Sequence, residues 1–305
     1  MHGLSRTRFT GPFVVILASS HFVVACADEG TYLPSPHENR NCPALPVDPE
    51  NPAISYDRED VVAGPSAWGK LLNAKGEVAY PGCANTMEQQ SPIALPSPEM
   101  PWATGGMYLS PEVLSWSRQA EVTSIINNGR TWLTAIAPTP ANTIQFRGEL
   151  YELQQFHVHT PGEHSIGGMS FPMELHLVHR GGSRAFAVVV AVMIEESAED
   201  NPEFAKLWSR FFECPEVAPT MLENVTVDVA SFLPANTAHF EYDGSLSTPP
   251  CTRVTHWIVM TEPIFASPAQ IARFKDSLGQ TNRPTQPIID EQLVTYEAPK
   301  DAHWQ

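Results

Sequence analysis

The sequence predicts a mainly β (α+β) fold: a single domain built on one large, mostly antiparallel, twisted sheet with a few peripheral helices. Among its 305 residues are 29 prolines, roughly twice the number expected at about 5% usage, which indicates many turns and few long helices. Strand-like runs outnumber helical ones and do not alternate with them as βαβ units. The chain is uniform after about residue 52 and contains no internal repeat, so one domain is expected.

Four segments are predicted to be strands of this sheet. Three of them are residues 154–159, 174–179 and 255–261. The fourth, residues 185–194, is almost wholly apolar, which predicts a central strand buried on both faces.

Two helices are predicted from their start signals. Ser267-Pro268 begins one of them, with Gln270 completing a capping box and Gly279 past its end. The other begins at Asn201-Pro202, an N-cap followed by a first-turn proline. Apolar residues then follow that start at helical spacing: Phe204, Leu207, Trp208, Phe211 and Phe212.

Residues 1–25 have the pattern of a signal peptide. Arg6 and Arg8 precede an apolar run at residues 13–25 that ends in small residues. A buried first helix is the alternative interpretation. We therefore expect an exported protein, either secreted or periplasmic.

Two processing sites overlap at the end of this segment. Cleavage after Ala27 fits a small-x-small rule, whereas residues 23–26 resemble a bacterial lipobox, in which Cys26 would carry a lipid and anchor the chain to a membrane. Both remain open. Three further parts are expected along the chain: a proline-rich arm at residues 26–52, the domain at residues 53–298 and a tail at residues 299–305.

Charge and hydropathy exclude several classes of protein. The 34 acidic and 18 basic residues give a net charge of −16, so nucleic-acid binding, which needs clustered Lys and Arg, is not expected. Hydrophobic residues make up 42% of the chain, which excludes a disordered protein. No apolar run reaches the roughly 20 residues that a membrane-spanning helix needs.

The cysteines are consistent with export. Four of the five remain if Cys26 is removed or lipidated, and an even number suits two disulfides in an oxidising compartment. Four free buried thiols are the alternative. No C-x-x-C pair occurs, which excludes a cysteine zinc ribbon.

Histidines provide the clearest chemical signal. Five of the 11 lie between residues 157 and 179. His157 and His159 are two apart in a predicted strand and therefore share a face. If the strand at residues 174–179 is its neighbour, His176 can join them, and three neutral imidazoles with an open fourth position describe a catalytic zinc site.

The neighbouring residues favour His176 over His179 as the third ligand. Glu174 shares the face of His176, and Gln155 shares that of His157, so each can accept the second ring N–H of its histidine. His164 and His179 are instead expected to be buried structural histidines.

These residues resemble the alpha-class carbonic anhydrases over roughly residues 54–297. In addition to the histidine strands and Glu163-His164, the matching segments are Ser55-Tyr56, Trp68-Gly69, Gln90-Ser91-Pro92-Ile93, Asn127-Asn128-Gly129, Gly244-Ser245-Leu246-Ser247-Thr248-Pro249-Pro250, Trp257 and Asn282-Arg283-Pro284-Thr285-Gln286-Pro287.

The resemblance implies one zinc ion on His157, His159 and His176, and a zinc-bound hydroxide that attacks carbon dioxide to give bicarbonate and a proton. It implies further roles for seven other residues. Glu163 would orient the hydroxyl of Ser247, Thr248 would contact bicarbonate, and carbon dioxide would rest on an apolar wall formed by Val178, Val188, Leu246 and Trp257.

The resemblance also implies a disulfide between Cys83 and Cys251, as in exported family members. Cys42 and Cys214 would then be a second pair that pins the arm to the domain, or two unpaired thiols.

The sequence departs from the family pattern at two positions. Ser247 replaces a threonine and lacks the methyl group that restricts the rotamer. Arg130 replaces the histidine that carries the proton to solvent in the fastest members, and arginine stays protonated at neutral pH. We therefore expect slower proton transfer.

Two other function classes compete with an active carbonic anhydrase. A non-catalytic relative serving as a binding or adhesion module is the main alternative, but no zinc histidine is lost here. Another zinc hydrolase is the third, although the H-E-x-x-H helix of a peptidase is absent from the sequence.

Overall fold

The structure is a computed structural model. The residues that it describes are 42, 46, 48–98, 113–115, 118–181, 186–211, 214–289 and 295–297. The predicted signal peptide, Cys26, most of the arm and the tail at residues 299–305 lie outside the described residues.

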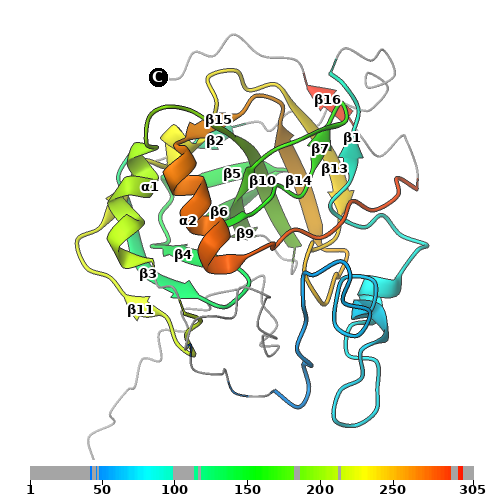
Figure 1. Cartoon of the computed structure of the whole chain (residues 1–305). Helices are drawn as coiled ribbons and strands as arrows, with labels where there is room; N and C mark the ends of the chain where they lie inside the picture. The colour runs from blue at the N-terminus through cyan, green and yellow to red at the C-terminus, as the bar shows by residue number, and fades with distance from the viewer. Residues whose placement is uncertain are drawn as a thin grey trace, which may run out of the picture.

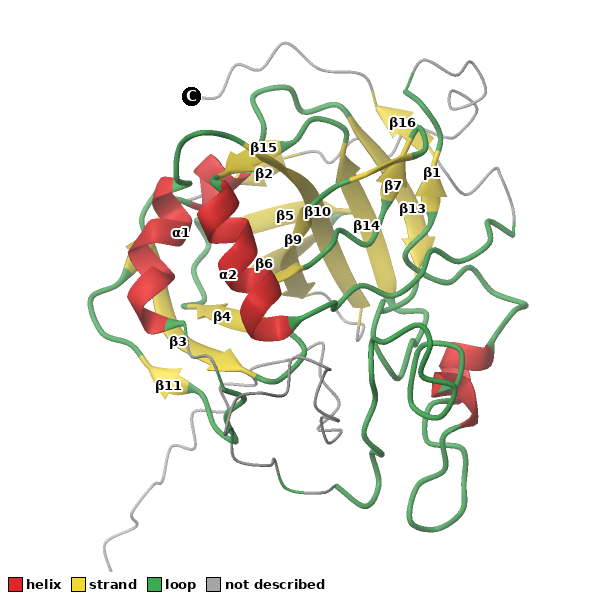
Figure 2. Ribbon diagram, in the orientation of Figure 1, coloured by secondary structure: helices red, strands yellow, loops and turns green. Residues whose placement is uncertain are grey.

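A large mixed sheet dominates the molecule (Figures 1 and 2). Within the described residues, the strand order along its main path is β11-β3-β4-β6-β9-β10-β14-β13-β16. The longer strands are β3 (Ala120–Asn127), β4 (Trp132–Ile136), β5 (Thr143–Phe146), β6 (Glu149–His159), β9 (Met173–Gly181), β10 (Phe186–Glu196), β13 (His239–Gly244) and β14 (Thr255–Met260).

Short strands complete this sheet and form a second one. Those of the large sheet are β2 (Val113–Ser115), β11 (Thr220–Met221), β12 (Thr226–Val227), β15 (Ile264–Ala266) and β16 (Thr295–Glu297). The small sheet contains β1 (Ala94–Leu95), β7 (Ser165–Ile166) and β8 (Met169–Ser170).

The predicted fold class is confirmed. In the large sheet, β10 pairs with β14 and β15 in parallel, and the other described pairs are antiparallel. All four predicted strands are present as β6, β9, β10 and β14, with ends that differ by a few residues. The apolar β10 lies at the centre, between β9 and β14, as expected of a strand buried on both faces.

The two helices begin where the sequence predicts. In α1 (Pro202–Leu207), the Asn201 side chain accepts hydrogen bonds from the backbone N–H groups of Glu203 and Phe204. In α2 (Pro268–Leu278), the predicted capping box of Ser267 is formed. Gly279 follows α2 with φ +70°, a conformation that glycine adopts without strain.

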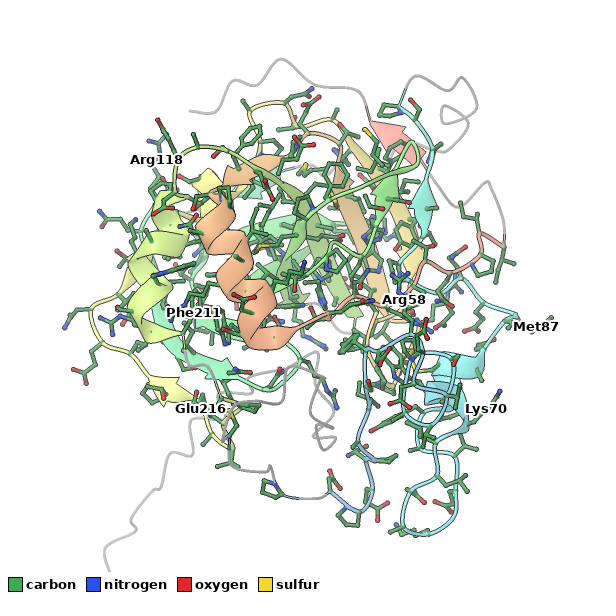
Figure 3. All side chains as sticks on the ribbon, viewed as in Figure 1. Arg58, Lys70, Met87, Arg118, Phe211 and Glu216 are labelled. Atoms are coloured by element: carbon green, nitrogen blue, oxygen red, sulfur yellow. A yellow bond between two sulfur atoms is a disulfide. The ribbon has the colours of Figure 1, made fainter. Side chains whose placement is uncertain are left out.

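The prediction for the end of α1 is wrong. The α-helix ends at Leu207, a 3-10 turn (Trp208–Arg210) follows, and Phe211 has extended backbone. Phe211 is labelled in Figure 3. Its ring stacks on Trp132 at a centroid distance of 4.4 Å and also contacts Phe274 of α2. Tertiary packing therefore overrides the helical spacing here. Phe212 lies outside the described residues.

The large sheet separates two apolar cores. On one side, α1 and α2 cover alternate residues of the central strands, including Leu175, Leu177 and Val190. On the other side, Val178, Val189 and Trp257 belong to a second cluster. A third, smaller cluster lies in the N-terminal part of the domain beside the short helices Trp68–Lys70 and Pro81–Ala84.

Two disulfides join N-terminal segments to later parts of the chain. Cys83 pairs with Cys251, as the family resemblance implies, and Cys42 pairs with Cys214. The second pair joins the proline-rich arm to the segment that follows α1. Within the part of the chain that the structure describes, no helix has the length and apolar character to span a bilayer.

Candidate metal centre

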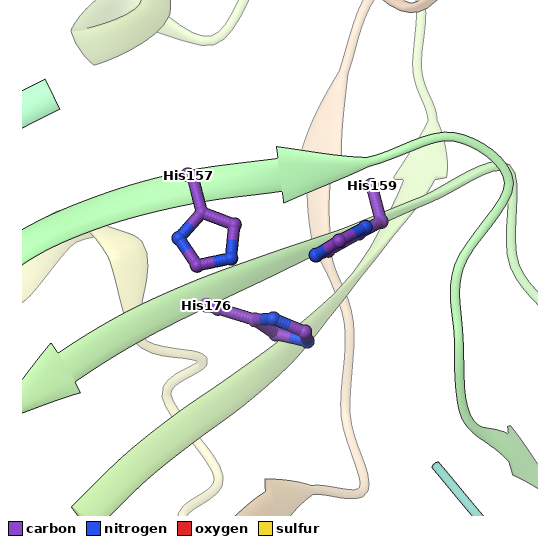
Figure 4. Close-up of side chains that lie close together, drawn as sticks. All are labelled: His157, His159 and His176. Carbon is purple, nitrogen blue, oxygen red and sulfur yellow. The ribbon is translucent and has the colours of Figure 1, made fainter. Parts of the chain in front are cut away.

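Three buried histidines converge on one face of the sheet (Figure 4). β6 and β9 are antiparallel neighbours whose register places His157 directly opposite His176. His159 lies two residues after His157 and points to the same face. The ring centroids lie 4.8 to 5.2 Å apart, and each ring offers a nitrogen within 4.8 Å of the others. The predicted triad is thus assembled.

Each imidazole donates one N–H to a fixed acceptor. His157 Nδ1 is 2.8 Å from Gln155 Oε1, and His176 Nε2 is 2.8 Å from Glu174 Oε1. His159 Nδ1 is 2.7 Å from the backbone carbonyl of Thr281. Since a carbonyl and a carboxylate accept only, these contacts fix the tautomers. The ring nitrogens that carry no proton, called the bare nitrogens below, are therefore Nε2 of His157, Nε2 of His159 and Nδ1 of His176.

The bare nitrogens fit a metal ion. His159 Nε2 is buried and has no hydrogen-bond partner among the described residues. An orphaned acceptor of this kind is costly unless it binds something. Burial lowers the pKa of His157 well below its ordinary value, and the neighbouring His176 and His159 lower it further. Burial also lowers the pKa of His159. Neutral imidazoles are the form that zinc binds.

Glu174 lies behind the triad and accepts hydrogen bonds from two histidine rings and two backbone N–H groups. Its Oε1 accepts hydrogen bonds from His176 and from His164 Nδ1, the latter at 2.6 Å, and its Oε2 accepts the backbone N–H groups of Glu163 and His164 at 2.7 Å. Although burial raises the pKa of Glu174, His164 and His176 outweigh it, and the pKa lies well below its ordinary value. His164, Glu174 and His176 lie close enough to resemble a second metal-binding group, but these hydrogen bonds already account for their contacts.

The other two histidines of the cluster are buried and hydrogen-bonded. His164 Nε2 lies 2.7 Å from the Tyr242 hydroxyl, and His179 donates from Nδ1 to the Val188 carbonyl at 3.2 Å. His179 projects from the opposite face of β9, where burial lowers its pKa to about 3. Neither belongs to the triad.

Glu163 and Ser247 do not form the contact that the resemblance implies. Glu163 Oε1 accepts the backbone N–H of Arg283 at 2.9 Å, whereas its Oε2 is buried with no hydrogen-bond partner among the described residues. The Ser247 side chain is also buried, but its hydroxyl makes no hydrogen bond to Glu163. Serine lacks the methyl group that restricts χ1 in threonine, so more rotamers are open to its hydroxyl.

The apolar wall requires one correction. Val178 and Trp257 lie on the triad side, and the Trp257 ring is 4.9 Å from that of His176. Val188 pairs with His179 and packs in the helix-side core, so it is not part of the wall. Its neighbour Val189 lies opposite Val178 and Trp257. A shift of one residue in a strand moves a side chain to the other face.

The remaining predicted residues lie in loops. Leu246 is partly exposed, and Thr248 is buried with its carbonyl accepting the Cys251 N–H at 2.8 Å. Arg130 follows the turn between β3 and β4, where the Asn128 side chain accepts its backbone N–H. The residue is only 4% exposed, so its positive charge is largely shielded from solvent.

Sequence reasoning missed the residues that position the site from a distance. Thr281 supplies a backbone carbonyl to His159, and Arg283 supplies a backbone N–H to Glu163. Neither contact uses the side chain of Thr281 or Arg283, so the identity of these two residues does not signal it. Tyr242 and Ser91 extend the hydrogen bonds of His164, and both lie in or beside segments that the resemblance includes.

Comparisons with known proteins point to one family. A family model described as eukaryotic-type carbonic anhydrase matches residues 63–295. A carbonic anhydrase of Klebsiella pneumoniae is 38% identical over 236 residues, which cover 77% of this chain and 87% of that protein. One of Pectobacterium carotovorum is 32% identical over 225 residues, covering 73% and 84%. The solved alpha-carbonic anhydrase of Photobacterium profundum has a TM-score of 0.64 at 30% identity, covering 80% of this chain and 99% of that one.

Proposed function

Because the chain belongs to the eukaryotic-type, or alpha, carbonic anhydrase family and is a carbonic anhydrase, we propose that it hydrates carbon dioxide reversibly to bicarbonate and a proton at one zinc ion held by His157, His159 and His176. The observation that supports this most strongly is the convergence of three bare imidazole nitrogens on one face of the sheet. All three residues are present, which disfavours a non-catalytic binding or adhesion module.

The triad would leave a fourth coordination position for water, as three-ligand zinc sites do. When bound, zinc would supply a nucleophile near neutral pH, because coordination lowers the pKa of water from 15.7 to about 7. Gln155, Glu174 and the Thr281 carbonyl hold the rings in place, and the carboxylate of Glu174 makes His176 a more basic ligand.

Glu163 and Ser247 would aim the nucleophile. Glu163 is held by the Arg283 N–H through one oxygen and has its second oxygen available. Rotation of the Ser247 hydroxyl toward that oxygen would give it a hydrogen-bond donor, which would leave the serine lone pair to accept a hydrogen bond from the reacting water. This hydrogen bond would satisfy Glu163 Oε2, a buried oxygen that is costly to leave without a donor.

The apolar wall suits carbon dioxide, the substrate, and the polar loop beside it suits bicarbonate, the product. Val178, Val189 and Trp257 would receive carbon dioxide, which has no net charge or dipole, and Leu246 would border the same space. Thr248, next to Ser247, would contact bicarbonate. Since an apolar surface solvates an anion poorly, the wall favours release of the product.

We also place this reaction outside the cytoplasm. The two disulfides are consistent with an oxidising compartment, and residues 1–25 have the pattern of a signal peptide. Lipidation of Cys26 would add a membrane anchor.

The proposed function is tested by stopped-flow hydration of carbon dioxide with the purified mature chain. Activity should disappear when a chelator removes the metal and return when one equivalent of zinc is added. The proposal would be wrong if the zinc-loaded chain does not accelerate hydration above the buffer rate.

A further inference from the structure

Two segments that are far apart in the sequence are joined beside the metal centre. One, residues 160–163, follows β6, and the other, residues 279–283, follows α2. The backbone N–H of Thr281 donates to the carbonyl of Thr160 at 2.8 Å, and the N–H of Thr160 donates to the Thr281 hydroxyl at 3.1 Å. The Thr160 hydroxyl donates to the Gly279 carbonyl at 2.7 Å. Asn282 adds a side-chain contact to the Gly162 carbonyl at 3.2 Å.

This junction supplies two contacts to the site at once. The Thr281 carbonyl accepts the Nδ1–H of His159, and two residues later the Arg283 N–H donates to Glu163. Both are backbone groups, so they can be placed only by fixing the segment that carries them. Besides the Asn282 amide, the side chains that fix it are the hydroxyls of Thr160 and Thr281, and both threonines are about 1% exposed.

We propose that the hydroxyls of Thr160 and Thr281 are positioning groups that set the His159 ring and the Glu163 carboxylate together, through the backbone of residues 279–283. This inference rests on the proposed function, since it assigns the two hydroxyls to the same zinc site. No chemistry of the reaction is attributed to them, because the two hydroxyls are engaged with the Thr160 N–H and the Gly279 carbonyl.

The physical reason lies in the anchor at Gly279. The Thr160 hydroxyl donates to the carbonyl of Gly279, the residue that follows α2 directly. Helix α2 is in turn held by Phe274, which packs among Trp132, Phe204 and Phe211. The hydrogen bond to Gly279 thus fixes residues 279–281 relative to α2, and with them the Thr281 carbonyl that orients His159. Without the hydroxyl, a buried carbonyl loses its donor and the segment can shift.

The test uses isosteric variants of the zinc-loaded full enzyme. Thr160→Val and Thr281→Val each remove one hydroxyl but leave the Thr281 carbonyl in the chain, and Thr160→Ser restores a hydroxyl at the first position. Thr143→Val is the matched control, because Thr143 also buries a hydroxyl that donates to a carbonyl, that of Pro140, but lies on β5 opposite Glu152.

Two quantities are measured for each variant: the rate of zinc transfer to a chelator and kcat/KM for carbon dioxide. Changes in groups that orient metal ligands typically cost 10- to 100-fold in metal affinity or activity. We therefore expect Thr160→Val and Thr281→Val to lose zinc about 10-fold faster and to lower kcat/KM. Thr160→Ser and Thr143→Val should keep both close to the wild type, even where Thr143→Val lowers the melting temperature as much as Thr160→Val.

The zinc-transfer rates separate a failure of this inference from a failure of the proposed function. Equal zinc-transfer rates in Thr160→Val and Thr143→Val, with zinc present in the wild type, would overturn this inference alone. If Thr160→Val does not fold, Thr281→Val against Thr143→Val gives the same comparison. A wild-type protein that binds no zinc would overturn the proposed function, and this inference with it.

Discussion

Ser247 is the site residue that is least suited to its proposed role, which is to hold an oriented hydroxyl beside Glu163. Glu163 holds a buried oxygen without a partner, and the hydroxyl that could satisfy it belongs to a serine, whose χ1 is less restricted than that of threonine. Fixing one side-chain rotor is worth about 0.5–1 kcal/mol.

We therefore predict that Ser247→Thr raises kcat/KM by about two- to fivefold, the rate equivalent of that free energy. Stopped-flow hydration measures it, and Ser247→Ala, which loses the hydroxyl, should lower the same quantity. A value of kcat/KM that is unchanged in Ser247→Thr would show that the serine is already oriented.

Arg130 leads to a prediction about the second stage of catalysis, in which the metal-bound water loses its proton. This stage needs a group that titrates near neutral pH, and a guanidinium stays charged there. We predict that turnover at saturating carbon dioxide rises with the concentration of an imidazole buffer. Arg130→His should raise kcat and leave kcat/KM nearly unchanged. If turnover does not respond to buffer or to this substitution, proton transfer does not limit the rate.

Residue identity was enough to predict the triad but not its surroundings. His157, His159 and His176 stand out because alternation in two strands places them on one face. Val188 and Val189 carry no such signal, since a wholly apolar strand has no alternation that tells one face from the other. The Thr281 carbonyl, 122 residues from the histidine it orients, has no side-chain signature.

At the scale of the elements, β13 and β14 carry a second buried ionisable group away from the triad. On the helix side of the sheet, His256 lies 2.7 Å from Asp243 and 3.0 Å from Glu241, and Arg147 binds the other oxygen of Asp243. Burial alone would lower the pKa of His256, but the hydrogen bonds to Asp243 and Glu241 outweigh it and raise the pKa above 6.5. The pKa of Asp243 falls to about 2.

The sign of the resulting pH dependence follows from these directions. A raised histidine pKa stabilises the fold below pH 6.5, the unfolded value, and that contribution is lost as the pH rises through the folded value. The contribution of Asp243 is present above pH 3.8 and is lost as the pH falls toward 2. The cluster thus stabilises the fold most between these limits.

We predict that His256→Gln lowers the free energy of unfolding more at pH 6 than at pH 9. Urea unfolding of the zinc-loaded protein at the two pH values measures the difference, with His179→Gln as the control. His179 is neutral in the same range, since its pKa is about 3. An equal loss at both pH values would mean that His256 is not charged in the folded protein.

Elements were predictable where the local signal is complete. The capping box of α2 and the glycine after it fix both ends of that helix. For α1 only the start is encoded locally, because the aromatic spacing beyond Leu207 serves contacts with Trp132 and Phe274 rather than a further turn. A strand ends where its hydrogen-bonded partner strand ends, and the sequence of one segment does not reveal that partner.

At the scale of the whole molecule, the fold class followed from strand content and the absence of βαβ alternation. The same reasoning left the strand order undetermined, including the parallel pairing of β10 with β14, since that depends on contacts between distant segments. The disulfides join parts that the sequence keeps 168 and 172 residues apart, and the first of them ties the Ser247 loop to the N-terminal segment. The site is thus held by segments from distant parts of the chain as well as by its two histidine strands.

The central claim is that His157, His159 and His176 hold the zinc ion on which the activity depends. The most direct measurement is the zinc content per chain of the purified wild type and of His176→Ala. We predict about one zinc ion per chain in the wild type, and a large loss of zinc in the variant, because two imidazoles bind zinc far more weakly than three. Full retention of zinc by His176→Ala would contradict the account.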